Sequence, residues 1–408
     1  MKKSIIKNHT ITAISIGLIV VAFVLFYFSD GFGKVLRRGG SDFFRYSAFL
    51  KAFFEIVVLI FSVFTLRKPK AYILLTLLIL FFSFLIGQFF LALKFQEINF
   101  FENFNTLFKY FFPLIFALLI FDIIKSNRYP KLVFKSYKVI IILNSLLILI
   151  GYLFNISVFK TYSGPWRFGY DGMILAQNEA TFIFIFALTI VYYRRFYLNI
   201  KEIFFWIVLL PSLIVATKGV YLYIILLFLF HIFKRISLKK ILIYGISFLF
   251  FGYFLFSTAI NKIFINSYNV FMYMYDKGGL AHALFSGRNQ YIDDKLIPLV
   301  TKYWSLPNFF VGGQDVVEHY IEMGFIDLFL FFGLFGFILY LYVFYQIFNL
   351  LPFQGYFKLF FGFSLFVIIA TAGHFFESGI AGIHFIFLII ILRKYGESIE
   401  TKPEIHES

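Results

Sequence analysis

The sequence predicts an all-α polytopic membrane protein, and its composition, hydropathy and charge placement all support this class. The chain has 408 residues, of which 61% are hydrophobic and 14% are charged. Its mean hydropathy is +0.87. Soluble globular chains carry about 25% charged residues. The apolar residues are gathered into long runs, as expected if helices cross a bilayer, because one crossing takes about 20 apolar residues.

These runs predict about 12 transmembrane helices in a single integral membrane domain that covers residues 1–408. They fall near residues 10–28, 48–66, 71–93, 107–124, 137–156, 174–193, 203–217, 219–233, 241–259, 325–346, 359–377 and 379–392. The first run is too long for the apolar core of a typical signal peptide, and no small-residue cleavage pattern follows it. We therefore assign it as the first span.

Residues 203–233 form one apolar run that is interrupted only by Lys218. The run is too long for one ordinary crossing, and a single crossing would move the basic sequence KRISLKK to the outer side. We therefore expect two short helices with a tight turn at ATKGV. Lys218 then lies within the membrane profile near the outer surface, where its amine either extends to the headgroups or binds a ligand.

Positive charge indicates the orientation of the chain. The net charge is +16, and most of the 37 Lys and Arg residues lie on alternate loops such as RKPK. The positive-inside rule then places both termini in the cytoplasm, and it explains the charge by anionic headgroups rather than by nucleic acid. The chain has no Cys, which excludes disulfides and thiolate chemistry. No His and acidic residues show metal-ligand spacing, so no metal or cofactor is expected.

The largest outer segment is the loop 260–324, which is too long to lack regular structure. We expect short amphipathic helices lying on the membrane, with Trp304 at the interface. The loop ends in VVEHYIEMGFID, which brings Glu318, His319, Glu322 and Asp327 to the edge of the next apolar run. Ionisable groups at a membrane edge are costly and mark functional sites, although these acids are alternatively a solvated rim.

The acidic cluster also makes local predictions. If the helix begins early, Glu318, His319 and Glu322 share one of its faces. Asp327 is expected to orient the helix start, where negative charge suits the dipole. Gly333 and Gly336 are expected to allow close helix packing.

Two further outer segments carry polar residues. Arg167 lies between Trp166 and Phe168, and it is either an interfacial anchor or a clamp for an anion. Asn178 follows at a span start. The turn AGHFFESG between the last two spans carries His374, which either faces a substrate or caps a helix.

Five features in this order resemble the O-antigen polymerase and O-antigen ligase superfamily, which builds bacterial surface polysaccharide from lipid-linked units. They are the stretch from Arg167 to Asn178, the turn Thr217-Lys218-Gly219, the triplet Ser286-Gly287-Arg288, the pattern from Glu322 to Asp327 with Gly333 and Gly336, and the pair Gly373-His374. The resemblance covers roughly residues 100–392.

The resemblance implies a GT-C-like membrane bundle below one large periplasmic loop, in the cytoplasmic membrane of a bacterium. The expected activity is that of a polysaccharide polymerase, which transfers a growing glycan from polyprenyl (undecaprenyl) diphosphate onto a lipid-linked repeat unit. The expected partners are this lipid-linked oligosaccharide and membrane lipids, with a chain-length regulator and a flippase as candidates.

One position separates polymerases from ligases in this family. Ligases carry a His-Asn pair about eleven residues before the first glycine of the G-x-x-G span, where this chain has Glu322-Met323. Polymerases tend to have Glu-x-Asp, and here Gly324 stands where the second carboxylate would be. A three-residue shift would bring His319 into the ligase position, so a ligase stays open. A transporter is a third alternative, although no internal repeat is evident.

The reaction itself assigns candidate roles. The diphosphate leaves, so positive charge must meet it, and Arg288, Arg167 and Lys218 supply that charge. The acceptor hydroxyl needs a base, for which Glu322 is the first candidate and His319 the second. His374, Asn178 and Asp327 are expected on the substrate side.

The charge pattern yields a test of topology. Reporter fusions at Lys239 and Asn308 should report opposite compartments, the cytoplasm for Lys239 and the outside for Asn308, because the basic loops stay inside. If both fusions report one side, the twelve-span assignment is wrong, with the division of 203–233 the first suspect.

Overall fold

The computed structural model describes residues 2–40, 46–95, 97–124, 130–162, 167–235, 265, 268–353 and 355–400. These residues are mainly helical, and the pairing of strands within them is limited to an isolated bridge between Lys160 and Tyr170. The predicted all-α class is confirmed.

The predicted apolar runs coincide with helices. The bundle contains α1 (Lys2–Arg38), α2 (Tyr46–Phe64), α3 (Lys68–Ala92), α4 (Phe100–Ile123), α5 (Pro130–Leu153), α6 (Gln177–Phe196), α7 (Phe204–Val215), α8 (Lys218–Arg235), α12 (Gly324–Phe348), α13 (Tyr356–Ala372) and α14 (Gly379–Glu400). Within the described residues, α1 to α5 and α12 are long and apolar enough to cross a membrane, which indicates a multi-pass membrane protein. The run 241–259 and Lys239 lie outside the described residues.

The core of the bundle lies along α4, α6 and α14. Most residues of α4 and α6 are buried, and α14 packs against both helices. Peripheral helices instead expose large apolar side chains, such as Phe49 and Phe53 on α2 and Leu359 and Phe363 on α13. In water such surfaces would be an aggregation hazard, whereas lipid solvates them.

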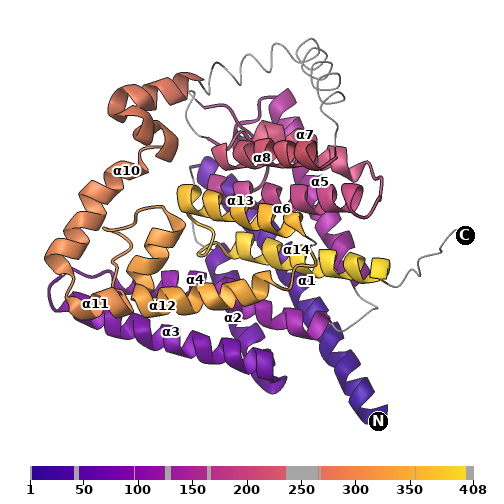
Figure 1. The fold of residues 1–408 in the computed structure, drawn as a ribbon, viewed down its shortest axis with the longest axis horizontal. Coiled ribbons are helices and arrows are strands. Elements are labelled where there is room, and N and C mark those ends of the chain that lie inside the picture. The colour runs from indigo at the N-terminus through magenta and orange to yellow at the C-terminus, as the bar shows by residue number, and fades with distance from the viewer. Residues whose placement is uncertain are drawn as a thin grey trace, which may run out of the picture.

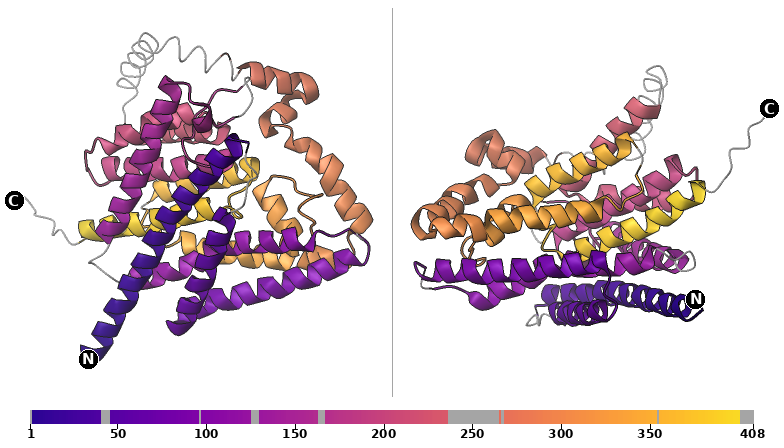
Figure 2. Two further views of the ribbon diagram at one scale, coloured as in Figure 1. Left: turned by 180° about the vertical axis from the view of Figure 1, so that it is seen from behind. Right: turned by 60° about the horizontal axis from the view of Figure 1, so that its bottom comes forward.

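The two ends of the bundle differ. The first residues of α1 and the last turns of α14 lie at one end, and the helical segment within 268–311 lies at the other (Figure 1, Figure 2). That segment includes α10 (Arg288–Tyr291), the turns η2 (Ile292–Leu296) and η3 (Leu299–Tyr303), and α11 (Leu306–Val311). The expectation of short helices in this loop is therefore confirmed.

The predicted break in 203–233 is also confirmed. Helix α7 ends at Val215 and α8 begins at Lys218. Between them Ala216 has a φ of 58°, in the left-handed region that ends a helix. The two helices form a hairpin, and Lys218 stands at its turn.

Two expectations about the segment 304–336 have different outcomes. Trp304 is only 4% exposed, and its indole Nε1 donates to the carbonyl of Gly313 at 2.8 Å, so it packs inside the protein instead of lying at the surface. The close packing expected at the glycines is confirmed. A Cβ added to Gly333 would come within 2.3 Å of the Gly312 nitrogen, and one added to Gly336 would come within 3.2 Å of Leu80 on α3.

Candidate functional site

The candidate site is assembled where several helices begin or end. Lys218 is the first residue of α8, and Arg288 begins α10. Glu322 lies just ahead of α12, and His374 follows the last residue of α13. Arg288 and Glu322 form an ion pair, and Lys218 and His374 lie within electrostatic range of it, although the four residues are far apart in the sequence.

Arg288 is at the centre of these contacts. Its Nη2 donates to Glu322 Oε2 at 3.1 Å, and its Nη1 makes longer bonds to the carbonyls of Phe285 at 3.5 Å and Thr371 at 3.4 Å. The Arg288 side chain is 12% exposed and that of Glu322 is 37% exposed. The Nε atom of Arg288 is buried and finds no hydrogen-bond partner among the described residues. A guanidinium with an unused donor is suited to bind an anion.

Lys218 lies beside this ion pair. Its Nζ donates to the carbonyl of Ala283 at 2.8 Å and to Ser286 Oγ at 2.9 Å. Arg167 and Arg288 are both close enough to act electrostatically on its amine. The three residues predicted to meet a diphosphate therefore lie in one region of positive potential, with Glu322 as the carboxylate that contacts Arg288.

His374 forms a second polar group next to the ion pair. Its Nδ1 lies 2.7 Å from the Tyr320 hydroxyl and 2.8 Å from Glu377 Oε1. Burial lowers the pKa of His374 to about 4, although the Glu322 carboxylate opposes this shift. Burial also raises the pKa of Glu377 to about 7. His374 is therefore neutral near pH 7, and Tyr320 and Glu377 share the hydrogen-bonding capacity of its Nδ1.

Strained backbone is concentrated around the site. Of the six non-glycine residues described with positive φ, four belong to it: Ala216, Ser286, Glu322 and His374. Such conformations are unfavourable for residues with a Cβ, and they are enriched at functional sites. Gly373 is needed for the same reason. Its φ is 61°, and a Cβ there would come within 2.3 Å of the Glu322 carbonyl oxygen.

The backbone around Glu322 corrects one expectation. Helix α12 begins at Gly324, so Glu318, His319 and Glu322 do not share a helical face. The cause is Asp327, whose carboxylate accepts bonds from the backbone nitrogens of Ile321 at 2.9 Å and Met323 at 2.8 Å. These bonds fasten the residues on either side of Glu322 in a non-helical conformation.

The other predicted residues lie in different surroundings. His319 is 6% exposed, and its ring packs against Phe95 and Tyr303. Burial lowers the pKa of His319, and its Nδ1 has no hydrogen-bond partner within the described part of the chain. Asn178 lies in the first turn of α6, beside Glu179, which accepts a bond from Ser378 Oγ at 2.9 Å. Trp166 falls outside the described residues.

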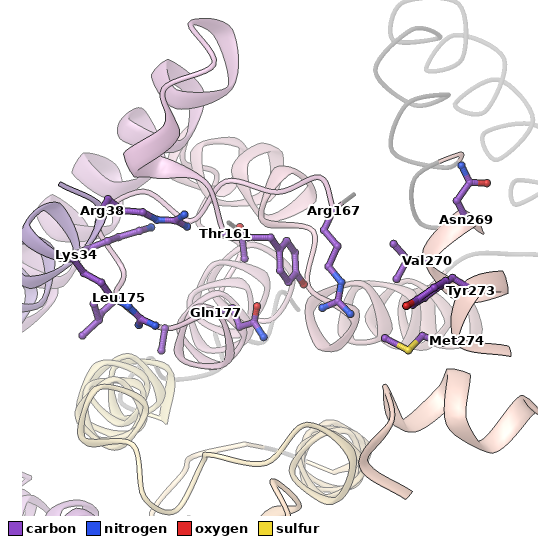
Figure 3. A pocket seen from close by; sticks show the side chains of 13 residues that line it. Lys34, Arg38, Thr161, Arg167, Leu175, Gln177, Asn269, Val270, Tyr273 and Met274 are labelled. Carbon is purple, nitrogen blue, oxygen red and sulfur yellow. The ribbon is translucent and has the colours of Figure 1, made fainter. Parts of the chain in front are cut away.

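Arg167 points into a cavity of about 980 Å³ (Figure 3). The cavity is also lined by Lys34, Arg37 and Arg38 from the last turns of α1, and on its other side by Asn269, Val270, Tyr273 and Met274. Lys34, Arg37 and Arg38 are not among the site residues that the sequence predicts. They follow shortly after the first apolar run of the sequence, and this cluster of basic residues is the signal that could have identified them.

No group of three or more His, Asp or Glu side chains suited to a metal ion occurs among the residues that the structure describes. No known protein family, curated protein or solved structure matches the chain.

The assembled site can be tested by cross-linking, because the chain has no Cys of its own. A Lys218→Cys, Ser286→Cys double variant in native membranes should be joined by a short bis-maleimide, since the two side chains are 2.9 Å apart in the wild type. Mass spectrometry of the digest would identify the linked peptides. A Lys68→Cys, Ser286→Cys pair is the control, and equal linkage of both pairs would contradict the arrangement.

Proposed function

We propose that the chain is a polysaccharide polymerase of the bacterial cytoplasmic membrane. It would transfer a growing glycan from a polyprenyl diphosphate carrier onto a lipid-linked repeat unit at the outer face. The observation that carries the proposal is the convergence of Arg288, Lys218 and Glu322, because the reaction needs cations for a leaving diphosphate and a base for a hydroxyl.

The proposal includes a membrane topology of twelve spans with both termini in the cytoplasm and a GT-C-like bundle. Eleven described helices coincide with predicted spans, and the remaining run is 241–259. The starts of α8 and α12 and the end of α13 then all face outward. This topology would put the site at one membrane surface, where the diphosphate of a lipid-anchored donor must lie.

The proposed reaction is a direct displacement. The acceptor hydroxyl oxygen forms a bond to the anomeric carbon of the donor sugar, and the bond from that carbon to the diphosphate oxygen breaks. The diphosphate leaves with the bonding electron pair, and the proton of the hydroxyl passes to Glu322. Arg288 and Lys218 stabilise the negative charge that develops on the diphosphate. Arg288 can then exchange part of its contact with Glu322 for the phosphate oxygens, which leaves the carboxylate available as the base.

The ligase alternative depends on a histidine as the base. His319 is enclosed by Phe95 and Tyr303, whereas His374 lies within electrostatic range of Glu322 and Arg288. A ligase that moves glycan to a lipid A core or another acceptor would therefore use His374 more readily than His319. The transporter alternative predicts translocation of the lipid-linked glycan without lengthening, which liposomes containing the purified protein would distinguish.

Glu322→Gln tests the base. The variant retains the side-chain shape but cannot take the proton, and loss of a general base costs on the order of 10²–10⁴-fold in rate. We expect it to insert normally and bind donor while making only single repeat units, as read from glycan ladders.

Two further variants show whether the effect is specific to Glu322. Glu318→Gln removes the charge of an exposed neighbouring carboxylate and should leave the ladder unchanged. His319→Ala should be milder than Glu322→Gln for a polymerase. A full ladder from Glu322→Gln would remove Glu322 from the mechanism.

Arg288→Lys tests whether Arg288 holds the leaving diphosphate through its planar guanidinium group. Lysine retains the charge but lacks the fork that reaches Glu322, Phe285 and Thr371, so polymer synthesis should fall about 10- to 100-fold. The rate should be compared at equal protein level with Lys302→Ala, which removes an exposed cation from the same outer segment. Near-normal polymer from Arg288→Ala would exclude this role.

A further inference from the structure

The cavity beside Arg167 has a strongly positive wall. Lys34, Arg37, Arg38 and Arg167 all line it, and its lining contains no acidic residue among those described. Lys34 forms an ion pair with Asp171 and donates to the carbonyl of Gly172 at 2.8 Å, so its charge is already balanced. The guanidinium groups of the other three residues, Arg37, Arg38 and Arg167, form no ion pair with another described residue.

Arg38 and Arg167 are each positioned by a contact with a neutral group, and Asp171, the ion-pair partner of Lys34, also lies within electrostatic range of Arg38. Arg38 Nη2 donates to the carbonyl of Lys160 at 3.2 Å, which ties the end of α1 to the connection between α5 and α6. Arg167 lies over the ring of Tyr162, with 5.1 Å between its Cζ and the ring centroid. A helix dipole favours Arg37 and Arg38 at the end of α1, but it does not account for Arg167, which comes from a different segment.

The cavity adjoins the candidate active site, but neither Arg288 nor Lys218 lines it, and Arg167, which the sequence suggested for the leaving diphosphate, faces the cavity instead. Arg167 lies between Arg38 and Tyr273 in the close view (Figure 3). It is also within electrostatic range of Lys218, and the Tyr162 hydroxyl donates to the carbonyl of Ala216 in the α7–α8 turn at 3.4 Å. The cavity volume of about 980 Å³ exceeds the needs of one diphosphate and leaves room for attached sugars.

We infer that this cavity binds a second diphosphate, that of the acceptor lipid-linked glycan. The inference rests on the proposed polymerase function, in which both substrates carry a diphosphate. The donor reacts at the carbon that bears its diphosphate, so that group belongs beside Arg288. The acceptor reacts through a sugar hydroxyl distant from its own diphosphate, so that group needs a cationic site offset from the centre. Arg37, Arg38 and Arg167 provide such a site.

Binding stoichiometry tests the inference on the full-length chain in detergent, with farnesyl diphosphate as the probe. Calorimetry should give two sites per wild-type chain. The Arg37→Gln, Arg38→Gln double variant should retain one, with the lost site weakened about tenfold or more. Arg288→Gln should retain the other. Lys201→Gln, which removes an exposed cation elsewhere, should retain both sites. Two undiminished sites in the double variant would overturn the inference.

Two further experiments identify the molecule whose phosphate groups the cavity binds. Nanodiscs of phosphatidylglycerol should leave the cavity site available to the probe, and displacement by that lipid would overturn the assignment to an acceptor. In the polymer assay, the double variant should use a diphosphate-free oligosaccharide acceptor as well as the wild type does, but a lipid-linked acceptor less well. Equal losses with both acceptors would also overturn the assignment.

The same data separate this inference from the proposed function. If the wild-type chain binds two diphosphates but lengthens no glycan, the polymerase function and the acceptor role of the cavity are both wrong. The cavity is then still a diphosphate site. If the wild-type chain makes polymer but has only one diphosphate site, the inference about the cavity is wrong and the polymerase function is retained.

Discussion

The structure depends on a constraint that hydrocarbon imposes on the peptide backbone. Inside a bilayer every N–H and C=O must be paired within the protein, so a spanning chain stays helical and becomes irregular at the ends of its helices or where the protein encloses it, as at Gly333 within α12. The candidate site consists of such ends. Glu322 and His374 adopt left-handed backbone conformations outside the helices, and Lys218 stands at a hairpin turn. The strained conformations that position these side chains are thus confined to places where the bilayer permits them.

Charges within the bundle follow a related rule. Lys70 and Asp122 are fully buried and lie 2.6 Å apart, and Ser15 donates to the same carboxylate oxygen at 2.9 Å. Removing either member of such a pair leaves an uncompensated buried charge and strongly destabilises a protein. Buried charges therefore tie α1, α3 and α4 together. The guanidinium groups of Arg288 and Arg167 differ, because Arg288 Nε has no hydrogen-bond partner among the described residues and Arg167 forms no ion pair with a described residue.

The fold holds the backbone around Glu322 rigidly, which suits the proposed chemistry. Asp327 belongs to the first turn of α12, which packs against α3 and α13, and its carboxylate fixes the amides on both sides of Glu322. Gly373 approaches the Glu322 carbonyl from the end of α13 so closely that no side chain fits between them. Glu322 is therefore held by two helices at once, which suits a group that must meet a reacting hydroxyl in a fixed geometry.

The sequence by itself determined the membrane class, the positions of the described apolar helices and the division of 203–233, because bilayer thickness sets the length of an apolar helix. It also identified Arg288, Glu322 and Lys218 as candidates. The tertiary structure decided which of them meet, since Arg288 contacts Glu322 across 34 positions and Lys218 contacts Ser286 across 68. It overturned the early helix at Glu318, and it brought the end of α1 to Arg167. The hydrophobic periodicity of a local segment does not predict such contacts, because they depend on how helices far apart in the chain pack together.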